Sequence, residues 1–228
     1  MKRFYADVTI GEANNILLDG RPLKTPRRAA LAVPSLALAE AIADEWRTQG
    51  EKVDPRTMPL TGLANAAIDV VGTDRGAFLA TLNAYAETDM LTYRADQPAD
   101  LVARQRQFWD PLLGWATKRY DAHFNVTSGI LHTPQPDPTI IRLRAALSIH
   151  DDFQLAALAP IVSISGSLVI ALMLAEDAID CATAFNAAHL DELYQVEHWG
   201  EDSLASGLRT ARRADFFAAV SFLALLRG

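Results

Sequence analysis

One uncharged run of 21 residues, Leu155–Ala175, constrains the fold of this chain more than any other feature. The run is as long as a membrane-spanning helix, but Pro160 and the small residues of 163–167 interrupt its centre. Acidic residues flank both ends, whereas a spanning helix usually has Lys or Arg beside its cytoplasmic end. We therefore interpret the run as two buried helical pieces that break at Ser163–Ser165, inside a larger helical core.

Composition supports a large buried core and excludes several functional classes. The chain has 228 residues, of which 50% are hydrophobic and 21% charged, which fits one large domain or two small ones. The formal net charge of -7 argues against a nucleic-acid partner, because binding to phosphates requires a basic surface. The single cysteine, Cys181, excludes an internal disulfide and a metal cluster held by several cysteines.

The first residues of the chain predict a small antiparallel meander of three or four short strands over 3–34. Asp19-Gly20 is the strongest hairpin sequence, because both central residues of that turn need a positive φ. Pro22 places the strand after the turn at an edge of the sheet, since proline cannot donate to a neighbouring strand. Ala30–Val33 is expected to form a further short strand.

A helix is expected directly after the meander. Ser35 can cap it, apolar residues recur at helical spacing as far as Trp46, and Gly50 is its expected end. The apolar stripe should pack on the meander, which makes Trp46 a packing residue, while Gly20 and Pro22 are structural residues of the turn and edge. We predict that residues 1–56 form a small α+β domain.

From residue 57 to 228 the sequence predicts only helices, packed as an orthogonal bundle, so the fold class is α+β. Thr61 and Asp74 are expected to cap two helices, and Asp137-Pro138 to start another after a loop over 125–136. The expected helices cover 62–71, 74–90, 100 onward, 138–149, 151–163, 165–179, 181–199 and 203–226.

Few residues in the sequence favour catalysis. No glycine-rich phosphate loop is present, and no two histidines lie four residues apart. Glu87 and Asp89 could act as a general acid and base, and His189 lies one helical turn from Glu192. Two ligands do not make a metal site, so we predict no catalytic, cofactor or metal site.

An acidic segment with aromatic residues, 191–202, is the best candidate for binding a protein partner. Acidic residues around exposed aromatic side chains are typical of a docking surface. The alternative is a solvated acidic face with Trp199 buried in the core. The candidate partner-binding residues are Asp191, Glu192, Tyr194, Gln195, Glu197 and Trp199.

The last helix begins with the basic residues Arg209, Arg212 and Arg213, ahead of Phe216 and Phe222. The basic charge ends before the apolar run begins, so a core helix is favoured over a helix that lies on a membrane.

Several blocks of sequence together resemble one family of assembly chaperones. In order they are Lys2-Arg3-Phe4-Tyr5, the run from Leu18 to Pro26, Glu45-Trp46, the run from Met58 to Asn65, Glu87-Thr88-Asp89, Tyr194-Gln195 and Trp199-Gly200. In this order and spacing they resemble the chaperone that binds the alpha subunit of the catalytic head of F-type ATP synthase.

The resemblance implies a protein without catalytic activity or cofactor that binds free alpha subunit before the beta subunit joins. It implies a small N-terminal α+β domain followed by an orthogonal helix bundle, acting as a monomer without membrane insertion. The family's acidic helix falls on Asp191 and Glu192. Eukaryotic members work in the mitochondrial matrix, and the absence of a leader here predicts a bacterial, cytoplasmic member.

Two other functions stay open at this point. The chain could be a helical adaptor with another protein partner. It could also be an enzyme that uses Glu87, Asp89 or His189 with Glu192.

Overall fold

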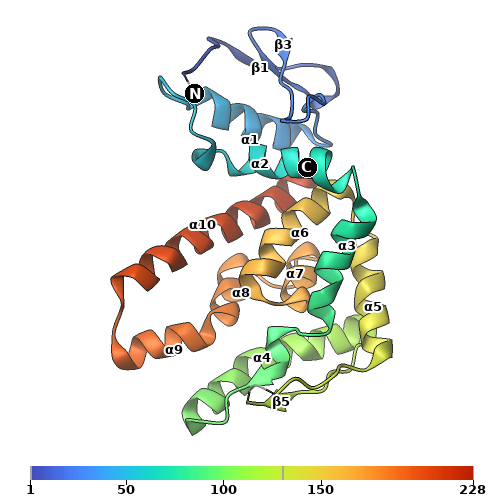
Figure 1. Cartoon of the computed structure of the whole chain (residues 1–228), viewed down its shortest axis with the longest axis vertical. Helices are drawn as coiled ribbons and strands as arrows, with labels where there is room; N and C mark the ends of the chain where they lie inside the picture. The colour runs from blue at the N-terminus through green and yellow to red at the C-terminus, as the bar shows by residue number, and fades with distance from the viewer. Residues whose placement is uncertain (1, 130, 228) are drawn as a thin grey trace. The chain divides into compact units, whose positions relative to one another are not determined.

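The structure of this chain, a computed structural model, describes residues 2–129 and 131–227 and divides them into two compact units. Unit 1 comprises the chain up to Phe78, Asp151–Ala157 and the chain from Phe217 onward. Unit 2 comprises Leu79–His150 and Leu158–Phe216. Figure 1 shows the elements along the chain. The predicted domain boundary after residue 56 stays a prediction.

Unit 1 begins with the predicted antiparallel meander, β1 (Val8–Ile10), β2 (Ile16–Leu18) and β3 (Arg21–Pro22), in the order β1-β2-β3. The turn between β2 and β3 has a φ of 48° at Asp19 and 74° at Gly20, as the hairpin sequence predicts. The further strand expected at Ala30–Val33 is wrong, because Ala30 and Ala32 form only isolated bridges to other segments.

Helix α1 (Leu36–Arg47) covers the meander, and the Oγ atom of Ser35 accepts from the N–H of Leu38 at 3.1 Å, as expected for its cap. The helix ends at Arg47 with Thr48 as its C-cap, two residues before the expected end at Gly50. Trp46 is 8% exposed and lies edge-on to Tyr5, whose hydroxyl donates to the Trp46 carbonyl oxygen at 2.7 Å. Trp46 therefore belongs to the core of unit 1.

Glu45 on α1 caps the next helix, α2 (Pro59–Ala66). Its carboxylate accepts from the N–H of Leu60 at 2.7 Å and from the N–H of Thr61 at 2.8 Å. The prediction that Thr61 is itself the cap is wrong, because Thr61 lies inside the helix and its hydroxyl also donates to Glu45. A carboxylate 15 residues earlier in the chain satisfies the free donors of the first turn.

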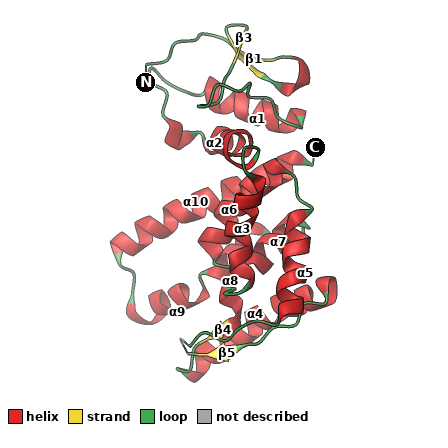
Figure 2. Cartoon of the chain, turned by 45° about the vertical axis from the view of Figure 1, so that its right-hand side comes forward, coloured by secondary structure: helices red, strands yellow, loops and turns green. Residues whose placement is uncertain are grey.

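The remaining α-helices follow α2 along the chain (Figure 2). They are α3 (Arg75–Asn83), α4 (Ala99–Tyr120), α5 (Asp137–Ser148), α6 (Asp152–Ser165), α7 (Leu168–Ala175), α8 (Cys181–Ala188), α9 (Leu190–Trp199) and α10 (Ser203–Leu226). A short parallel pair, β4 (Tyr93–Arg94) with β5 (Thr127–Ser128), lies within the region where only helices were expected.

Two predicted helices are shorter in the structure. The helix expected over 74–90 ends at Asn83 and continues only as a 3₁₀ turn, Ala84–Ala86. The helix expected over 181–199 is divided at His189 into α8 and α9. Arg212 and Arg213 of α10 are exposed, whereas Phe216 and Phe222 are fully buried, so its C-terminal half is a core helix as predicted.

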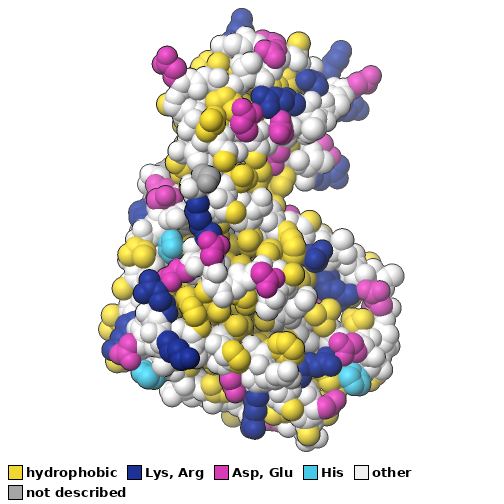
Figure 3. All heavy atoms as spheres, turned by 180° about the vertical axis from the view of Figure 1, so that it is seen from behind, with side chains coloured by type: hydrophobic (Ala, Val, Ile, Leu, Met, Phe, Trp, Pro, Cys, Tyr) yellow, Lys and Arg dark blue, Asp and Glu magenta, His cyan; other side chains and the backbone are white. Residues whose placement is uncertain are grey.

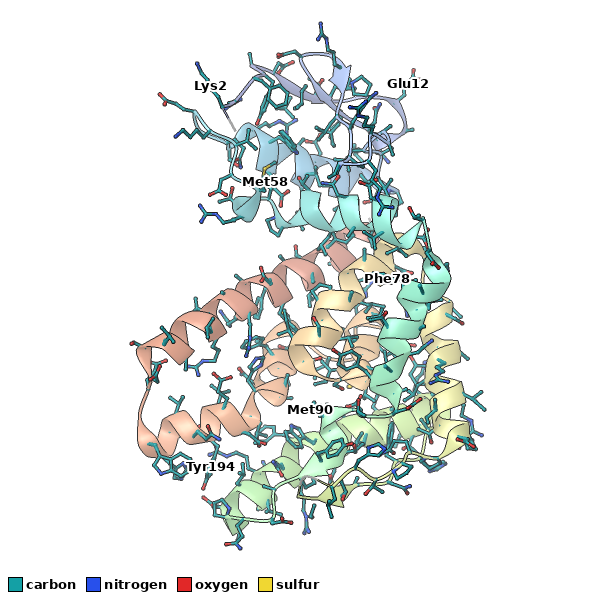
Figure 4. All side chains as sticks on the ribbon, viewed as in Figure 1. Lys2, Glu12, Met58, Phe78, Met90 and Tyr194 are labelled. Atoms are coloured by element: carbon teal, nitrogen blue, oxygen red, sulfur yellow. The ribbon has the colours of Figure 1, made fainter. Side chains whose placement is uncertain are left out.

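The uncharged run forms two buried helical pieces, α6 and α7, as predicted, but it breaks at Gly166-Ser167, slightly later than expected. Gly166 has a φ of +67°, which favours glycine, and a side chain there would also press on Met90, which is labelled in Figure 4. Among the described residues no helix, α6 and α7 included, has the length and apolarity that crossing a bilayer demands.

Asp89 holds the buried start of α7. Its Oδ2 accepts from the Ser167 hydroxyl and from the N–H of Val169, both at 3.0 Å, and its Oδ1 accepts from the N–H of Leu91 at 3.1 Å. The side chain is fully buried, and this burial raises the pKa of Asp89 to about 6 despite the hydrogen bonds that oppose the shift.

We predict that Trp46→Arg abolishes the recovery of soluble protein. An arginine in this core position would be a buried, unpaired charge in place of a packed ring, which costs at least about 3 kcal/mol. Soluble expression and circular dichroism measure the effect. The matched control is Trp199→Arg, because Trp199 is 75% exposed and its replacement should leave the fold intact. A folded, soluble Trp46→Arg variant would contradict the assignment of Trp46 to the core.

We predict that Asp89 makes the free energy of unfolding depend on pH. Because its pKa is raised in the folded chain, its protonation favours folding. This contribution is complete below its ordinary pKa of 3.8 and is lost as the pH rises through about 6. Urea unfolding of the natural chain and of Asp89→Asn at pH 5 and pH 7.5 measures it. Relative to the variant, the natural chain should gain stability at pH 5, and an unchanged difference would contradict the prediction.

Candidate partner-binding surface

The predicted acidic segment folds as α9, which starts where His189 separates it from α8. The ring of His189 is buried and stacks on Phe185 with 4.0 Å between centroids, and its Nδ1 lies 2.9 Å from the Phe185 carbonyl oxygen. Burial lowers the pKa of His189, which favours a neutral ring. His189 is thus a buried packing residue at the junction of α8 and α9.

Asp191 attaches α9 to α4 through a buried amide. Its Oδ1 accepts from the Nε2 of Gln105 at 2.7 Å, and Gln105 is fully buried. The Oε1 of Gln105 accepts from the N–H of Ala95 at 2.8 Å, directly after β4. Asp191 is therefore attached to a buried amide, Gln105, that links three segments of unit 2.

Glu192 attaches α9 to α10. Its carboxylate lies 3.0 Å from Nη1 of Arg209, whose Nη2 lies 2.7 Å from the carboxylate of Glu201. The Arg209 side chain is only 13% exposed, so the two carboxylates hold it in place between the helices. Gly200 makes the turn possible with a φ of 85°. We call α9, this turn and the first half of α10 (203–215) the α9–α10 hairpin.

Tyr194 and Glu197 also face α4. Tyr194, labelled in Figure 4, is 4% exposed, and its hydroxyl donates to Asp100 at 2.8 Å. Arg104 donates to Glu197 at 2.7 Å. These contacts hold the hairpin on α4, so any part that Tyr194 plays in partner binding is indirect.

Apolar side chains of the hairpin point to solvent. Trp199 is 75% exposed, so the alternative that places it in the core is wrong. On α10, Leu204 is 77% and Leu208 is 57% exposed, four residues apart on one face of the helix. These two leucines were not among the predicted binding residues, although the absence of charge over 203–208 could have indicated them. Gln195 is also exposed.

An apolar groove of about 520 Å³ adjoins α9 on unit 2. Phe108 on α4, 47% exposed, and Leu193 on α9 contribute to its apolar wall, and the Arg104–Glu197 pair lies at its edge. It is lined by Arg104, Gln107, Phe108, Thr183, Asn186, Ala187, Leu190, Leu193 and Glu197. Hydrophobic side chains also reach the surface among charged ones on the face that Figure 3 shows.

The residues considered for catalysis are not arranged as an active site. Glu87 pairs with Arg144 at 2.7 Å, whereas Asp89 is buried against the start of α7. Burial raises the pKa of Cys181 to about 11, which leaves it a thiol at neutral pH. Within residues 2–129 and 131–227, no three His, Cys, Asp or Glu side chains converge as metal ligands would.

Comparison with known proteins gives consistent matches. The profile of a family described as ATP12 chaperone protein matches residues 2–117. Protein atp12, mitochondrial, of Schizosaccharomyces pombe is 29% identical over 214 residues, which cover 87% of this chain and 74% of that protein.

Two bacterial crystal structures match almost the entire chain. Atp12 from Paracoccus denitrificans has a TM-score of 0.93 and 39% identity, covering 99% of this chain and 98% of its own. Atu1473 from Agrobacterium tumefaciens has a TM-score of 0.94 and 41% identity, covering 99% of this chain and 86% of its own.

We predict that Arg209→Met loosens the α9–α10 hairpin without unfolding the chain. The substitution keeps most of the side-chain length but leaves Glu192 and Glu201 without their shared cation, at a cost of about 1–3 kcal/mol. Amide hydrogen exchange over 203–212 should accelerate about tenfold or more, while exchange in α7 stays unchanged. Arg212→Met, a change at an exposed position three residues away, is the control. Equal hydrogen-exchange rates over 203–212 in the two variants would contradict the role of Arg209 in holding the hairpin.

Proposed function

The chain belongs to the ATP12 chaperone family, and from this we propose that it assists assembly of the catalytic head of an F-type ATP synthase. It binds the free alpha subunit and prevents its aggregation until the beta subunit joins. The observation that carries this proposal is the match of both sequence and fold over almost the full chain at 39–41% identity. The role is that of a binding protein without catalysis or cofactor, in the cytoplasm of a bacterium and as a monomer.

The α9–α10 hairpin and the groove beside it supply the kind of surface this function needs. A free subunit exposes apolar surface intended for its neighbour, and such surface aggregates unless it is covered. Trp199, Leu204 and Leu208 offer exposed apolar area, and the groove beside Phe108 can accept an apolar side chain. Large apolar anchors carry most of the binding energy in protein interfaces.

The predicted binding residues fall into two groups in this proposal. Gln195 and Trp199 contact the partner directly, and the outward parts of Glu197 steer it electrostatically. Asp191, Glu192 and Tyr194 position the hairpin, because their side chains are engaged with Gln105, Arg209 and Asp100. Release needs no nucleotide, since the beta subunit competes for the same apolar surface of the alpha subunit.

The direct test mixes the purified chain with separately expressed alpha subunit. Complex formation is followed by size-exclusion chromatography and alpha solubility by light scattering, with and without beta subunit. We expect a complex that protects alpha from aggregation and dissociates when beta is added. If alpha forms no complex, or if the chain binds another protein instead, the assignment of the alpha subunit is wrong.

We predict that the double variant Trp199→Ser and Leu204→Ser weakens alpha binding at least tenfold. Both substitutions remove exposed apolar area from the hairpin, so the free energy of unfolding should change little. The matched control is Ile149→Ser, another exposed apolar side chain, which lies at the end of α5. Isothermal titration calorimetry measures the dissociation constants. Unchanged affinity in the double variant would show that the alpha subunit binds to another surface of the chain.

The double variant Asp191→Lys and Glu192→Lys tests the positioning role. It should weaken alpha binding and also accelerate hydrogen exchange in the hairpin, because two of the contacts that hold α9 are lost. Weaker binding with unchanged exchange would instead make the two carboxylates direct contacts. Unchanged binding at moderate salt would remove them from the site altogether.

A further inference from the structure

A second cavity, of about 600 Å³, lies on the opposite face of α4 from the groove. Its α4 residues recur at Val102, Arg106, Asp110 and Leu113, whereas the groove uses positions 104, 107 and 108. We call it the Arg94 pocket. It is lined by Arg94, Val102, Arg106, Asp110, Leu113, Gly114, Thr117, His123, Phe124, Val126 and Ser128.

Arg94, at the end of β4, is the unusual residue in this wall. Its side chain is only 5% exposed, and its guanidinium lies over the ring of Trp109, 5.1 Å from the centroid. Nη2 lies 2.9 Å from Oδ1 of Asp110 as an ion pair, but none of Nε, Nη1 and Nη2 has a hydrogen-bond partner among the described residues. The chain thus holds a buried cation in place while leaving donors unused.

Unused buried donors are costly and therefore informative. A buried guanidinium without hydrogen bonds destabilises the fold, and burial accordingly lowers the pKa of Arg94. Its planar set of N–H groups matches the two oxygens of a carboxylate, which can accept two parallel hydrogen bonds. A carboxylate that enters the pocket would accept hydrogen bonds from the guanidinium N–H groups that have no acceptor within the fold.

The two carboxylates near Arg94 differ in how easily an incoming carboxylate could displace them. Asp110 is 60% exposed, so it can turn into solvent at little cost. Asp191 also acts on Arg94 electrostatically, but its Oδ1 is already taken by Gln105. Arg106 is exposed on the same wall without an ion pair among the described residues, and it adds a second positive charge.

Two other polar side chains of the wall, His123 and Thr117, are already engaged. His123 pairs with Asp121 at 2.9 Å, and the hydroxyl of Thr117 donates to backbone carbonyl oxygens. Apolar side chains form much of the remaining surface, including Phe124 and the half-exposed Val126. The pocket therefore combines a cationic donor with an apolar wall.

We propose that the Arg94 pocket binds a carboxylate side chain of a partner polypeptide, Asp or Glu, flanked by apolar residues. Asp110 pairs with Arg94 in the free chain, and the incoming carboxylate replaces Asp110 in this pair. The choice of a polypeptide over a small acid rests on the proposed chaperone function and on the apolar wall. This contact is separate from the apolar hairpin, so a partner could use both.

The test is an NMR titration of the labelled full chain with the peptide acetyl-Leu-Glu-Phe-amide. The comparison peptide carries Gln in place of Glu, and sodium acetate is the small-acid probe. We expect shifts in β4, in the 102–117 face of α4 and over 123–128, with the Glu peptide bound at least tenfold more tightly than the Gln peptide. Equal binding of the two peptides would overturn the proposal, and acetate binding as tightly as the Glu peptide would overturn the polypeptide assignment.

Two variants should act in opposite directions. Arg94→Lys keeps a positive charge but loses the planar donors, and should weaken Glu-peptide binding at least tenfold. Asp110→Asn removes the competing carboxylate and should strengthen it severalfold, which keeps the proposal falsifiable if Arg94→Lys fails to fold. The control is Arg144→Gln, an exposed arginine paired with Glu87. Weaker binding in Asp110→Asn would overturn the proposal.

The outcome is distinguishable from that of the proposed function. If the chain binds alpha subunit but not the Glu peptide, only the Arg94 pocket fails. If it binds the Glu peptide but not alpha, the pocket stands and the identity of the partner fails.

Discussion

The structure of unit 2 depends on how the free N–H groups at the start of α7 are satisfied inside an apolar core. Every residue of α7 from Leu168 to Leu174 is buried, so water cannot supply acceptors. Asp89 accepts from the N–H of Val169, and the hydroxyl of the cap residue Ser167 accepts from the N–H of Ile170. Asp89 thereby also fixes the segment that continues into β4. The positions of Arg94 and of the start of α4 follow from this anchor. A carboxylate that resembled a catalytic acid is thus the residue that allows an uncharged helix to begin in the core.

Helix α4 connects the two candidate binding features. One face carries Phe108 and the contacts to α9, and the opposite face carries Asp110 and the wall of the Arg94 pocket. Gln105 is buried between them and reaches both Asp191 and the backbone after β4. Because the same buried amide contacts α9 and the β4 segment, a displacement of the hairpin would be felt close to Arg94. The acidic residues of α9 act here as attachments more than as a free charged face.

Local sequence signals predicted the parts of the fold that depend on neighbouring residues. Asp19-Gly20 and the Ser35 cap act within a few residues, and the lack of charge in α6 and α7 fixes their burial. The cap of α2 by Glu45 could not be predicted in this way, because it depends on packing between helices. The burial of Arg94 and the exposure of Trp199 are also tertiary properties. For the candidate site, the sequence therefore predicted a helix with acidic and aromatic residues over 191–199, but not which of its side chains face solvent.

The exposed hairpin has a consequence for the behaviour of the free chain in solution. Trp199, Leu204 and Leu208 could bind another copy of the same chain as readily as a partner. The whole chain carries a net charge of -7, and Asp202 lies in the same segment, so two copies repel each other before their apolar surfaces meet. This repulsion acts over about one Debye length, roughly 8 Å at physiological ionic strength. The net negative charge of the chain thus opposes association between its own copies, and this effect weakens as the salt concentration rises.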